Sequence, residues 1–178
     1  MICFSEIFVQ QEYDQIFRKI PIPTSWIDIG CNCGYFTLWL IEQLTKTGLK
    51  DFNAMLIEPD PIHGDSIKTI IKKNNLDQKV TYYPKAVSSK EGTVEFIQRD
   101  FMFSTLRSVH SSNKQSIKVE SISQEQILNN ISDIDLLKID IEGAEFEFIQ
   151  SYSKVIENSK HVAMEWHSWH SGRGGKKH

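Results

Sequence analysis

Short apolar runs alternate with longer segments of helical periodicity along most of this 178-residue sequence. Strands that alternate with helices form right-handed βαβ units, which build a mostly parallel sheet with helices on both faces. The pattern therefore predicts an α/β fold in which the strands end at one common edge. The expected strands cover residues 26–29, 54–57, 80–83, 134–139 and 161–166, and the expected helices cover 35–46, 62–74, 123–129 and 144–152.

Two segments depart from this alternation. Apolar residues recur at helical spacing over 8–20, which predicts a leading amphipathic helix that Pro21 and Pro23 end. Residues 93–97 and 117–121 have strand character and are expected to form a β excursion from the main sheet.

The composition limits the classes of partner. Lys and Arg total 20 against 23 Asp and Glu, so the charge favours neither nucleic acid nor an anionic membrane surface. The three cysteines do not form a disulfide framework, and the N-terminus lacks a signal-peptide pattern. We expect a cytoplasmic single domain that acts on a small-molecule or glycan acceptor, with no nucleic acid or membrane as partner.

A glycine-rich loop follows the first expected strand. It contains Gly30, Asn32 and Gly34, with Asp28 directly before it. The glycines allow a tight turn and close approach to a ligand, and the following helix offers free N–H groups. A carboxylate at Asp28 repels a pyrophosphate but suits the ammonium group of a methionine moiety, whose carboxylate could use the loop N–H groups. An ordinary glycine-rich turn explains the motif about equally well.

Glu58 ends the second expected strand, 24 residues after Gly34. In nucleotide-binding Rossmann domains an acidic residue at roughly this separation (about 20 residues) binds the ribose hydroxyls. A solvated turn carboxylate beside Pro59 is the plainer alternative, and Asp60 is expected to cap the next helix.

Three carboxylates follow the apolar strand 134–139, namely Asp140, Glu142 and Glu145. A plain strand-to-helix turn needs one capping acid, so the excess indicates a polar ligand or a metal. We assign Glu145 to the favourable interaction of an acid with the helix dipole, and keep Asp140 and Glu142 as site residues.

A histidine-containing segment follows the last expected strand. Histidine is the side chain best suited to accept a proton near neutral pH, so His167 is the candidate general base, although a structural histidine is as probable from sequence alone. Glu165 and His167 with Asp140 could instead bind a metal, which we rank below a metal-free site. Cys31 and Cys33 lack the spacing and the second ligand pair of a zinc site.

With these segments placed, the chain resembles the FkbM family of methyltransferases, from about residue 26 to 167. The most specific similarity is the segment 138–145. The matching stretches are IDIGCNCGYFT, LIEPDP, KAVSSKEGTVEF, DIDLLKIDIEGAEFEFI and HVAMEWH.

The resemblance implies a Rossmann-like methyltransferase fold with seven strands, and S-adenosylmethionine as methyl donor. It also implies a role for each loop: Asp28, Gly30, Asn32 and Gly34 would hold the methionine part, Glu58 the ribose, and Ala86, Val87 and Ser88 would lie near the adenine, while Asp140 and Glu142 would face the donor or the acceptor. Members of the family are similar to enzymes that O-methylate sugars or natural products. The proton of such a hydroxyl would pass to His167 or Asp140.

The expected organisation is a leading helix and linker over 1–25, a methyltransferase domain over 26–170, and a flexible basic tail over 171–178. The family fold continues with a β hairpin, so we expect the sheet here to lack its last strands. A nicotinamide-dependent oxidoreductase and a non-catalytic remnant of the fold remain alternatives, the former disfavoured by the departure from G-x-G-x-x-G.

Overall fold

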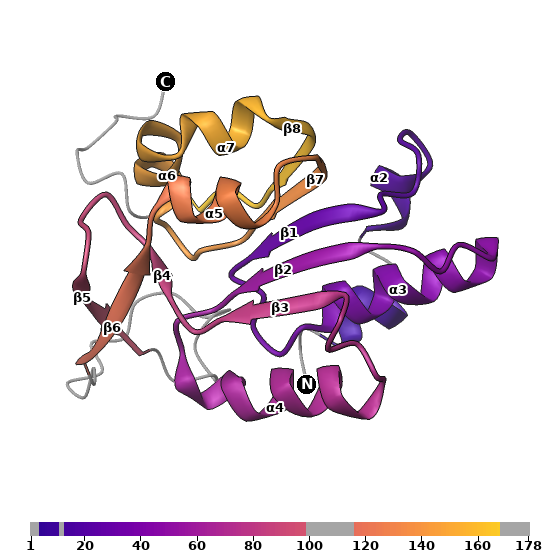
Figure 1. Cartoon of the computed structure of the whole chain (residues 1–178), viewed down its shortest axis with the longest axis horizontal. Coiled ribbons are helices and arrows are strands. Elements are labelled where there is room, and N and C mark those ends of the chain that lie inside the picture. The colour runs from indigo at the N-terminus through magenta and orange to yellow at the C-terminus, as the bar shows by residue number, and fades with distance from the viewer. Residues whose placement is uncertain (1–3, 11–12, 99–115, 168–178) are drawn as a thin grey trace, which may run out of the picture.

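The computed structural model describes residues 4–10, 13–98 and 116–167. At its centre is a five-stranded sheet in which all paired strands are parallel, in the order β3-β2-β1-β7-β8 (Figure 1). This order corresponds to positions 3-2-1-4-5 of the Rossmann sheet, and confirms the Rossmann-like fold. The bounds are β1 Ser25–Ile29, β2 Asn53–Ile57, β3 Val80–Tyr83, β7 Ile134–Ile139 and β8 Ser159–Met164.

Helices cover both faces of this sheet (Figure 1). On one face lie α3 (Tyr35–Thr47) and α4 (Pro61–Lys73), and on the other lie α5 (Gln124–Asn130), α6 (Glu145–Ser151) and α7 (Ser153–Glu157). Two helix ends lie where the sequence predicts them. Gly48, with a φ of 80°, is the C-cap of α3, and Asp60 is the N-cap of α4. None of the described helices combines the length and the apolar character needed to cross a membrane.

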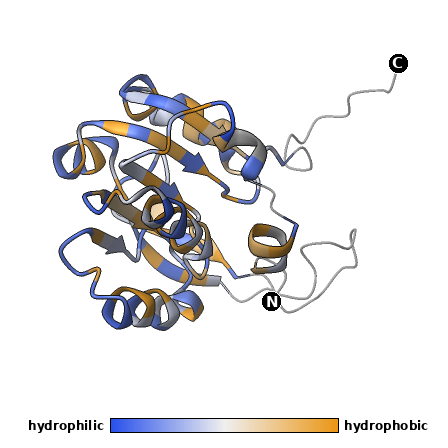
Figure 2. Ribbon diagram, turned by 90° about the vertical axis from the view of Figure 1, so that its right-hand side faces the viewer, coloured by the Kyte–Doolittle hydropathy of each residue, from blue (hydrophilic) through white to orange (hydrophobic). Residues whose placement is uncertain are grey.

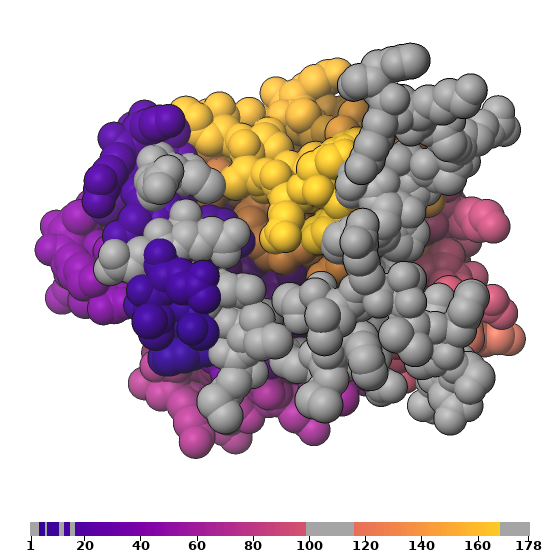
Figure 3. All heavy atoms as spheres, turned by 180° about the vertical axis from the view of Figure 1, so that it is seen from behind, coloured from indigo at the N-terminus to yellow at the C-terminus, as the bar shows by residue number. Residues whose placement is uncertain are grey.

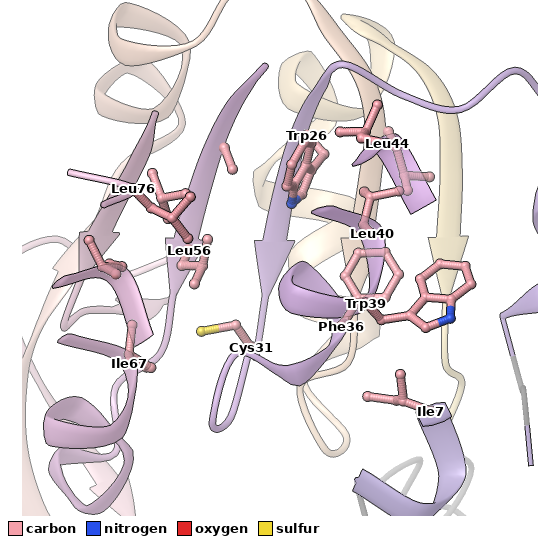
Figure 4. Packing of buried hydrophobic residues seen from close by; sticks show 14 residues of the cluster. Ile7, Trp26, Cys31, Phe36, Trp39, Leu40, Leu44, Leu56, Ile67 and Leu76 are labelled. Atoms are coloured by element: carbon pink, nitrogen blue, oxygen red, sulfur yellow. The ribbon is translucent and has the colours of Figure 1, made fainter. Parts of the chain in front are cut away.

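The core has two halves because successive side chains of a strand point to opposite faces of a sheet. Trp26 of β1 packs with Phe36 and Leu40 of α3 in one half (Figure 4). Its neighbour Ile27 packs with Phe148 of α6 in the other half. The ribbon in Figure 2 shows apolar residues recurring along the strands and on parts of the helices. This two-sided burial explains why the strands read as continuous apolar runs.

The expected leading helix is wrong as a single element. The chain instead forms a π-helical turn, η1 (Ser5–Val9), and a separate four-residue helix, α2 (Asp14–Phe17). Aromatic rings of this segment pack on α3: the ring of Phe4, directly before η1, lies 5.7 Å from that of Tyr35, and the ring of Phe17 in α2 lies 4.9 Å from that of Trp39. The apolar residues of this segment are thus explained by their contacts with α3, and not by one continuous amphipathic helix. Seen from behind, this segment is indigo in Figure 3.

A smaller sheet branches from the domain after β3, in the order β4-β6-β5. The antiparallel pair β5 (Thr93–Ile97) and β6 (Ser116–Ile122) confirms the β excursion, whereas the short β4 (Ala86–Val87) was not predicted. The hydroxyl of Tyr152 accepts the N–H of Ser88 (2.9 Å) and donates to the carbonyl oxygen of Ile122 (2.5 Å). One side chain therefore holds both ends of the excursion.

Tyr152 ends α6, which confirms the helix predicted over 144–152, and the short helix α7 that follows it was not predicted. The backbone of Tyr152 leaves the helical region, with φ −122° and ψ 32°, and separates α6 from α7. Its ring stacks on that of Phe148 with the centroids 4.7 Å apart.

Candidate functional site

The residues that follow four neighbouring strands form a row along the carboxyl edge of the main sheet. They are joined by the backbone bonds Gly30 N to Ile57 O (2.9 Å), Glu58 N to Tyr83 O (3.2 Å), Asp140 N to Ile29 O (3.0 Å) and Glu165 N to Ile139 O (2.9 Å). The strand order reverses between β1 and β7, and ligands of open α/β sheets bind at such a switch point. The row therefore brings together four of the positions that the sequence singled out.

Hydrogen bonds engage each N–H group of the glycine loop. Gly30, Asn32 and Gly34 all have positive φ, of 69°, 49° and 78°. The N–H groups of residues 30–34 donate to the carbonyl of Ile57 (twice), the Glu58 carboxylate, the Asn32 side chain and the carbonyl of Cys31. The expected free N–H groups within the loop are thus engaged. The next donors along the chain belong to the first turn of α3, whose N-cap Gly34 supplies no side-chain hydrogen bond.

The packing of the backbone around position 30 requires a glycine there. A Cβ atom at this position would lie 1.7 Å from the carbonyl oxygen of Asp140. The loop after β1 and the loop after β7 are therefore in direct backbone contact, which no larger residue at position 30 permits.

Asp28 lies beneath the loop, in β1, with no exposed surface. One carboxylate oxygen accepts the hydroxyl of Thr37 (3.1 Å), and the other lies 3.3 Å from Nζ of Lys138. Burial acts to lower the pKa of Lys138, but the carboxylates of Asp28 and Asp140 outweigh burial and raise it, so the ammonium stays charged. The Lys138 ammonium therefore neutralises the Asp28 carboxylate inside the protein.

Glu58 joins the second strand end to the glycine loop. Its two carboxylate oxygens accept the N–H groups of Asn32 and Asp60, both at 2.9 Å. Burial raises the pKa of this carboxyl to about 7, against the opposing effect of the two N–H groups. The side chain predicted to hold a ribose therefore already orders the loop.

His167 is buried at the end of β8 and is held by a carboxylate. Its Nδ1 lies 2.8 Å from Oε1 of Glu145, and the same oxygen accepts the N–H of Gly143 at 2.8 Å. Burial would raise the pKa of Glu145, but Gly143 and His167 outweigh it and lower the pKa. Burial likewise lowers the pKa of His167, but Glu145, Glu142 and Glu165 together raise it.

The other nitrogen of His167 faces a group of acids. Its Nε2 is 3.4 Å from Glu165 and 3.9 Å from Glu142, which has a φ of 51° that is rare outside glycine. Ligand atoms of Asp140, Glu165 and His167 all lie within 4.8 Å of one another. This spacing is compatible with the metal alternative, so the same atoms could hold a cation or, through His167, accept a proton.

The remaining predicted positions lie around this edge. Ala86 and Val87 form β4, where Ala86 is buried. Cys31 packs in the core, and Sγ of Cys33 lies 3.3 Å from Nδ1 of His63. Within the described residues no third ligand joins the two cysteines in a metal-binding group.

Two residues of the site were missed by sequence reasoning. Lys138 had no assigned role and Glu145 was assigned to the helix dipole. A signal for Lys138 existed, because it is a lone base in an apolar strand, as Asp28 is a lone acid in another, and the two are register partners. The contact of Glu145 with His167 has no comparable signal, since it depends on how α6 packs beside β8.

A known protein family matches most of this chain, including the four strand ends that contribute to the row. The family described as Methyltransferase FkbM domain matches residues 28–178. The comparison with curated proteins finds no match.

One similar solved structure is the crystal structure of methyltransferase FkbM from Methylobacillus flagellatus KT. The two chains superpose with a TM-score of 0.56 at 18% identity, over 84% of this chain and 34% of the other. This chain thus spans about a third of that one, and the likeness supports the fold.

Proposed function

We propose that this chain, which belongs to the FkbM methyltransferase family, binds S-adenosylmethionine at the carboxyl edge of its sheet and O-methylates a sugar or natural-product hydroxyl. The donor supplies an electrophilic methyl group when bound. The protein must then hold the two reactants in line, exclude water and accept the proton of the hydroxyl.

The residues at the switch point have the chemistry that such a donor requires. The first turn of α3 has no side-chain cap and favours an anion such as an amino-acid carboxylate. Glu58 stands beside this turn, and its oxygens have lone pairs that can accept ribose hydroxyls in addition to their two N–H donors. Asn32 and the backbone of Gly30 and Gly34 complete the methionine side of this proposed site, while Asp28 lies buried beneath them and is paired with Lys138.

The observation that carries the acceptor assignment is the His167–Glu145 pair. A hydroxyl must lose a proton as it is methylated, and an amine lone pair has no such need in the bond-forming step. The carboxylate of Glu145 can only accept, so it favours the tautomer in which Nδ1 carries the proton and Nε2 is the basic nitrogen. His167 thereby has the orientation of a general base.

Asp140 is the second candidate for the acceptor side. Its backbone belongs to the row at the strand ends, and its carboxylate lies 3.6 Å from the Lys138 ammonium. We assign Asp140 and Glu142 to positioning of donor or acceptor, and proton removal to His167.

A ligand screen followed by a turnover assay tests the proposal. S-adenosylhomocysteine should raise the melting temperature of the chain, and NAD should not. With S-adenosylmethionine labelled in its methyl group, label should pass to hydroxyl-bearing sugars or natural products and not to their O-methylated counterparts. Stabilisation by NAD alone would refute the donor assignment. Donor binding without transfer to any hydroxyl would refute the acceptor class.

A further inference from the structure

Lys138 connects three parts of the site through a single ammonium group. Its Nζ donates to the carbonyl oxygen of Gly30 (3.1 Å) and lies 3.3 Å from Oδ1 of Asp28 and 3.6 Å from Oδ2 of Asp140. The side chain is 6% exposed, so water does not replace these contacts. The glycine loop, the strand beneath it and the loop after β7 are thus held at one point.

The contact with Gly30 orients the loop backbone. A positive φ at Gly30 turns its carbonyl towards Lys138, while its N–H bonds to Ile57. On the other side, Asp140 donates its own N–H to Ile29 and directs its carboxylate to the same ammonium. The backbones of Gly30 and Asp140 are therefore fixed in both position and orientation.

Asp28 serves to keep this lysine in place. Among the described residues no hydrogen-bond donor satisfies its Oδ1, so the ion pair with Lys138 is what compensates that atom. A charge buried without its partner is strongly unfavourable, whereas removal of both charges costs far less. This asymmetry allows the structural role of the pair to be separated from any role in the reaction.

We propose that Lys138 is a positioning residue for methyl transfer, which fixes the Gly30 carbonyl and the Asp140 carboxylate on one ammonium and so sets where donor and acceptor meet. The inference rests on the proposed donor site at the glycine loop. It gives Lys138 a function beyond charge balance, because the residue joins the donor side of the site to the acceptor side.

The experiment compares three variants of the full chain. Lys138→Met leaves Asp28 unpaired and is expected to be unstable. The double variant Asp28→Asn with Lys138→Met leaves no buried charge and should recover most of the lost stability. Lys160→Met is the matched control, since Lys160 also bridges two acids, Asp133 and Asp135, but at the opposite edge of the sheet.

Two measurements are made on each variant. Amide hydrogen exchange, without any ligand, should be faster at Gly30, Cys31 and Asp140 in the double variant, and unchanged at Ala54 beside the opposite edge. Calorimetric titration with S-adenosylhomocysteine should show affinity weakened about ten-fold or more in the double variant, as expected for loss of a charge-assisted hydrogen bond. Lys160→Met should match the wild type in both.

The outcomes separate this inference from the proposed function. Unchanged exchange at the three amides would overturn the inference whether or not the ligand binds. Faster exchange with wild-type affinity would also overturn it, because loop order would then be irrelevant to the donor. If the wild-type chain fails to bind S-adenosylhomocysteine, the proposed donor site is wrong and so is the role in methyl transfer, while the exchange result still decides whether Lys138 orders the two loops.

Discussion

The imidazole of His167 is bound through Nδ1 to the buried carboxylate of Glu145, at 2.8 Å, although the two residues are 22 positions apart. The bond joins the start of α6 to the end of β8. It favours the tautomer with the proton on Nδ1, and it makes the orientation of the ring depend on how α6 packs beside β8.

Replacing Glu145 with Gln should move the pH dependence of turnover. Glu145 helps to raise the pKa of His167, so its neutralisation should lower that pKa. A general base works when unprotonated, and the acidic limb of the kcat profile should therefore shift to lower pH. Glu147→Gln, on the same helix but bonded to Ser88 and Ser89, is the control and should leave the limb in place. An unshifted limb in Glu145→Gln would exclude His167 as the titrating base.

Replacing His167 with Ala should lower kcat by roughly 10²–10⁴-fold with little change in donor affinity. The metal alternative, built on Asp140, Glu165 and His167, makes a further demand: activity of the wild type must fall with a chelator and return with a divalent ion. A structural histidine would instead lower the melting temperature and leave turnover near normal. Measuring kcat, melting temperature and chelator sensitivity together distinguishes the three roles.

Replacing Glu58 with Ala should weaken binding of S-adenosylhomocysteine by about 2–3 kcal/mol, as expected for lost charge-assisted hydrogen bonds. Two effects contribute, since Glu58 both faces the proposed ribose position and orders Asn32 through its N–H. Calorimetry measures the loss, and an unchanged affinity would remove Glu58 from the donor site.

Glu58 should also make stability depend on pH. Its pKa is about 7 in the folded protein and 4.5 in its ordinary state, so the folded protein holds this proton more tightly. Unfolding then releases a proton between these values, and the free energy of unfolding should fall as pH rises from about 4.5 to about 7, by about 3 kcal/mol at most. Urea denaturation at several pH values, compared with Glu58→Gln, isolates this contribution. Equal slopes in both proteins would contradict the raised pKa.

Gly30→Ala should destabilise the fold by more than about 4 kcal/mol, a size that requires a specific cause such as a buried collision. The added Cβ would meet the carbonyl oxygen of Asp140. Gly48→Ala is the control, because Gly48 also has a positive φ but a Cβ atom there would meet no other atom within 4 Å. It should cost about 1–2 kcal/mol, and similar losses at both positions would refute the collision.

The elements that the sequence predicted correctly are those whose bounds depend on residues close together in the chain. The bounds of β3 and β7 match the apolar runs, and the end of α3 follows from Gly48. The break in the leading segment could not be predicted, because it depends on a distant contact, the aromatic packing of Phe17 on Trp39 of α3. The short strand β4 was not predicted for a similar reason, since it pairs with β6, which lies far along the chain.

The candidate site divides in the same way. The glycines and acids at the strand ends could be predicted from the sequence, because a parallel sheet brings all its strand ends to one edge. What the side chains do there depends on partners from other strands and helices. Asp28 was expected to meet a ligand's ammonium, and the structure pairs it with that of Lys138. The free N–H groups expected in the glycine loop are engaged for an equally non-local reason, the backbone of Ile57 and the carboxylate of Glu58.

The double contact of Tyr152 with Ser88 and Ile122 has a consequence for how the protein can change. The excursion leaves the domain after Ser88 and rejoins it at Ile122, and one phenol bonds both residues, so Tyr152 keeps these two points side by side. A second tie lies at the end of β5, where Nε2 of Gln98 donates to Oδ1 of Asp60 at 2.8 Å, and the N–H of Asp60 in turn donates to Glu58. Exposed positions of β5 and β6 that make none of these bonds can therefore vary in sequence without moving the points at which the small sheet meets the large one.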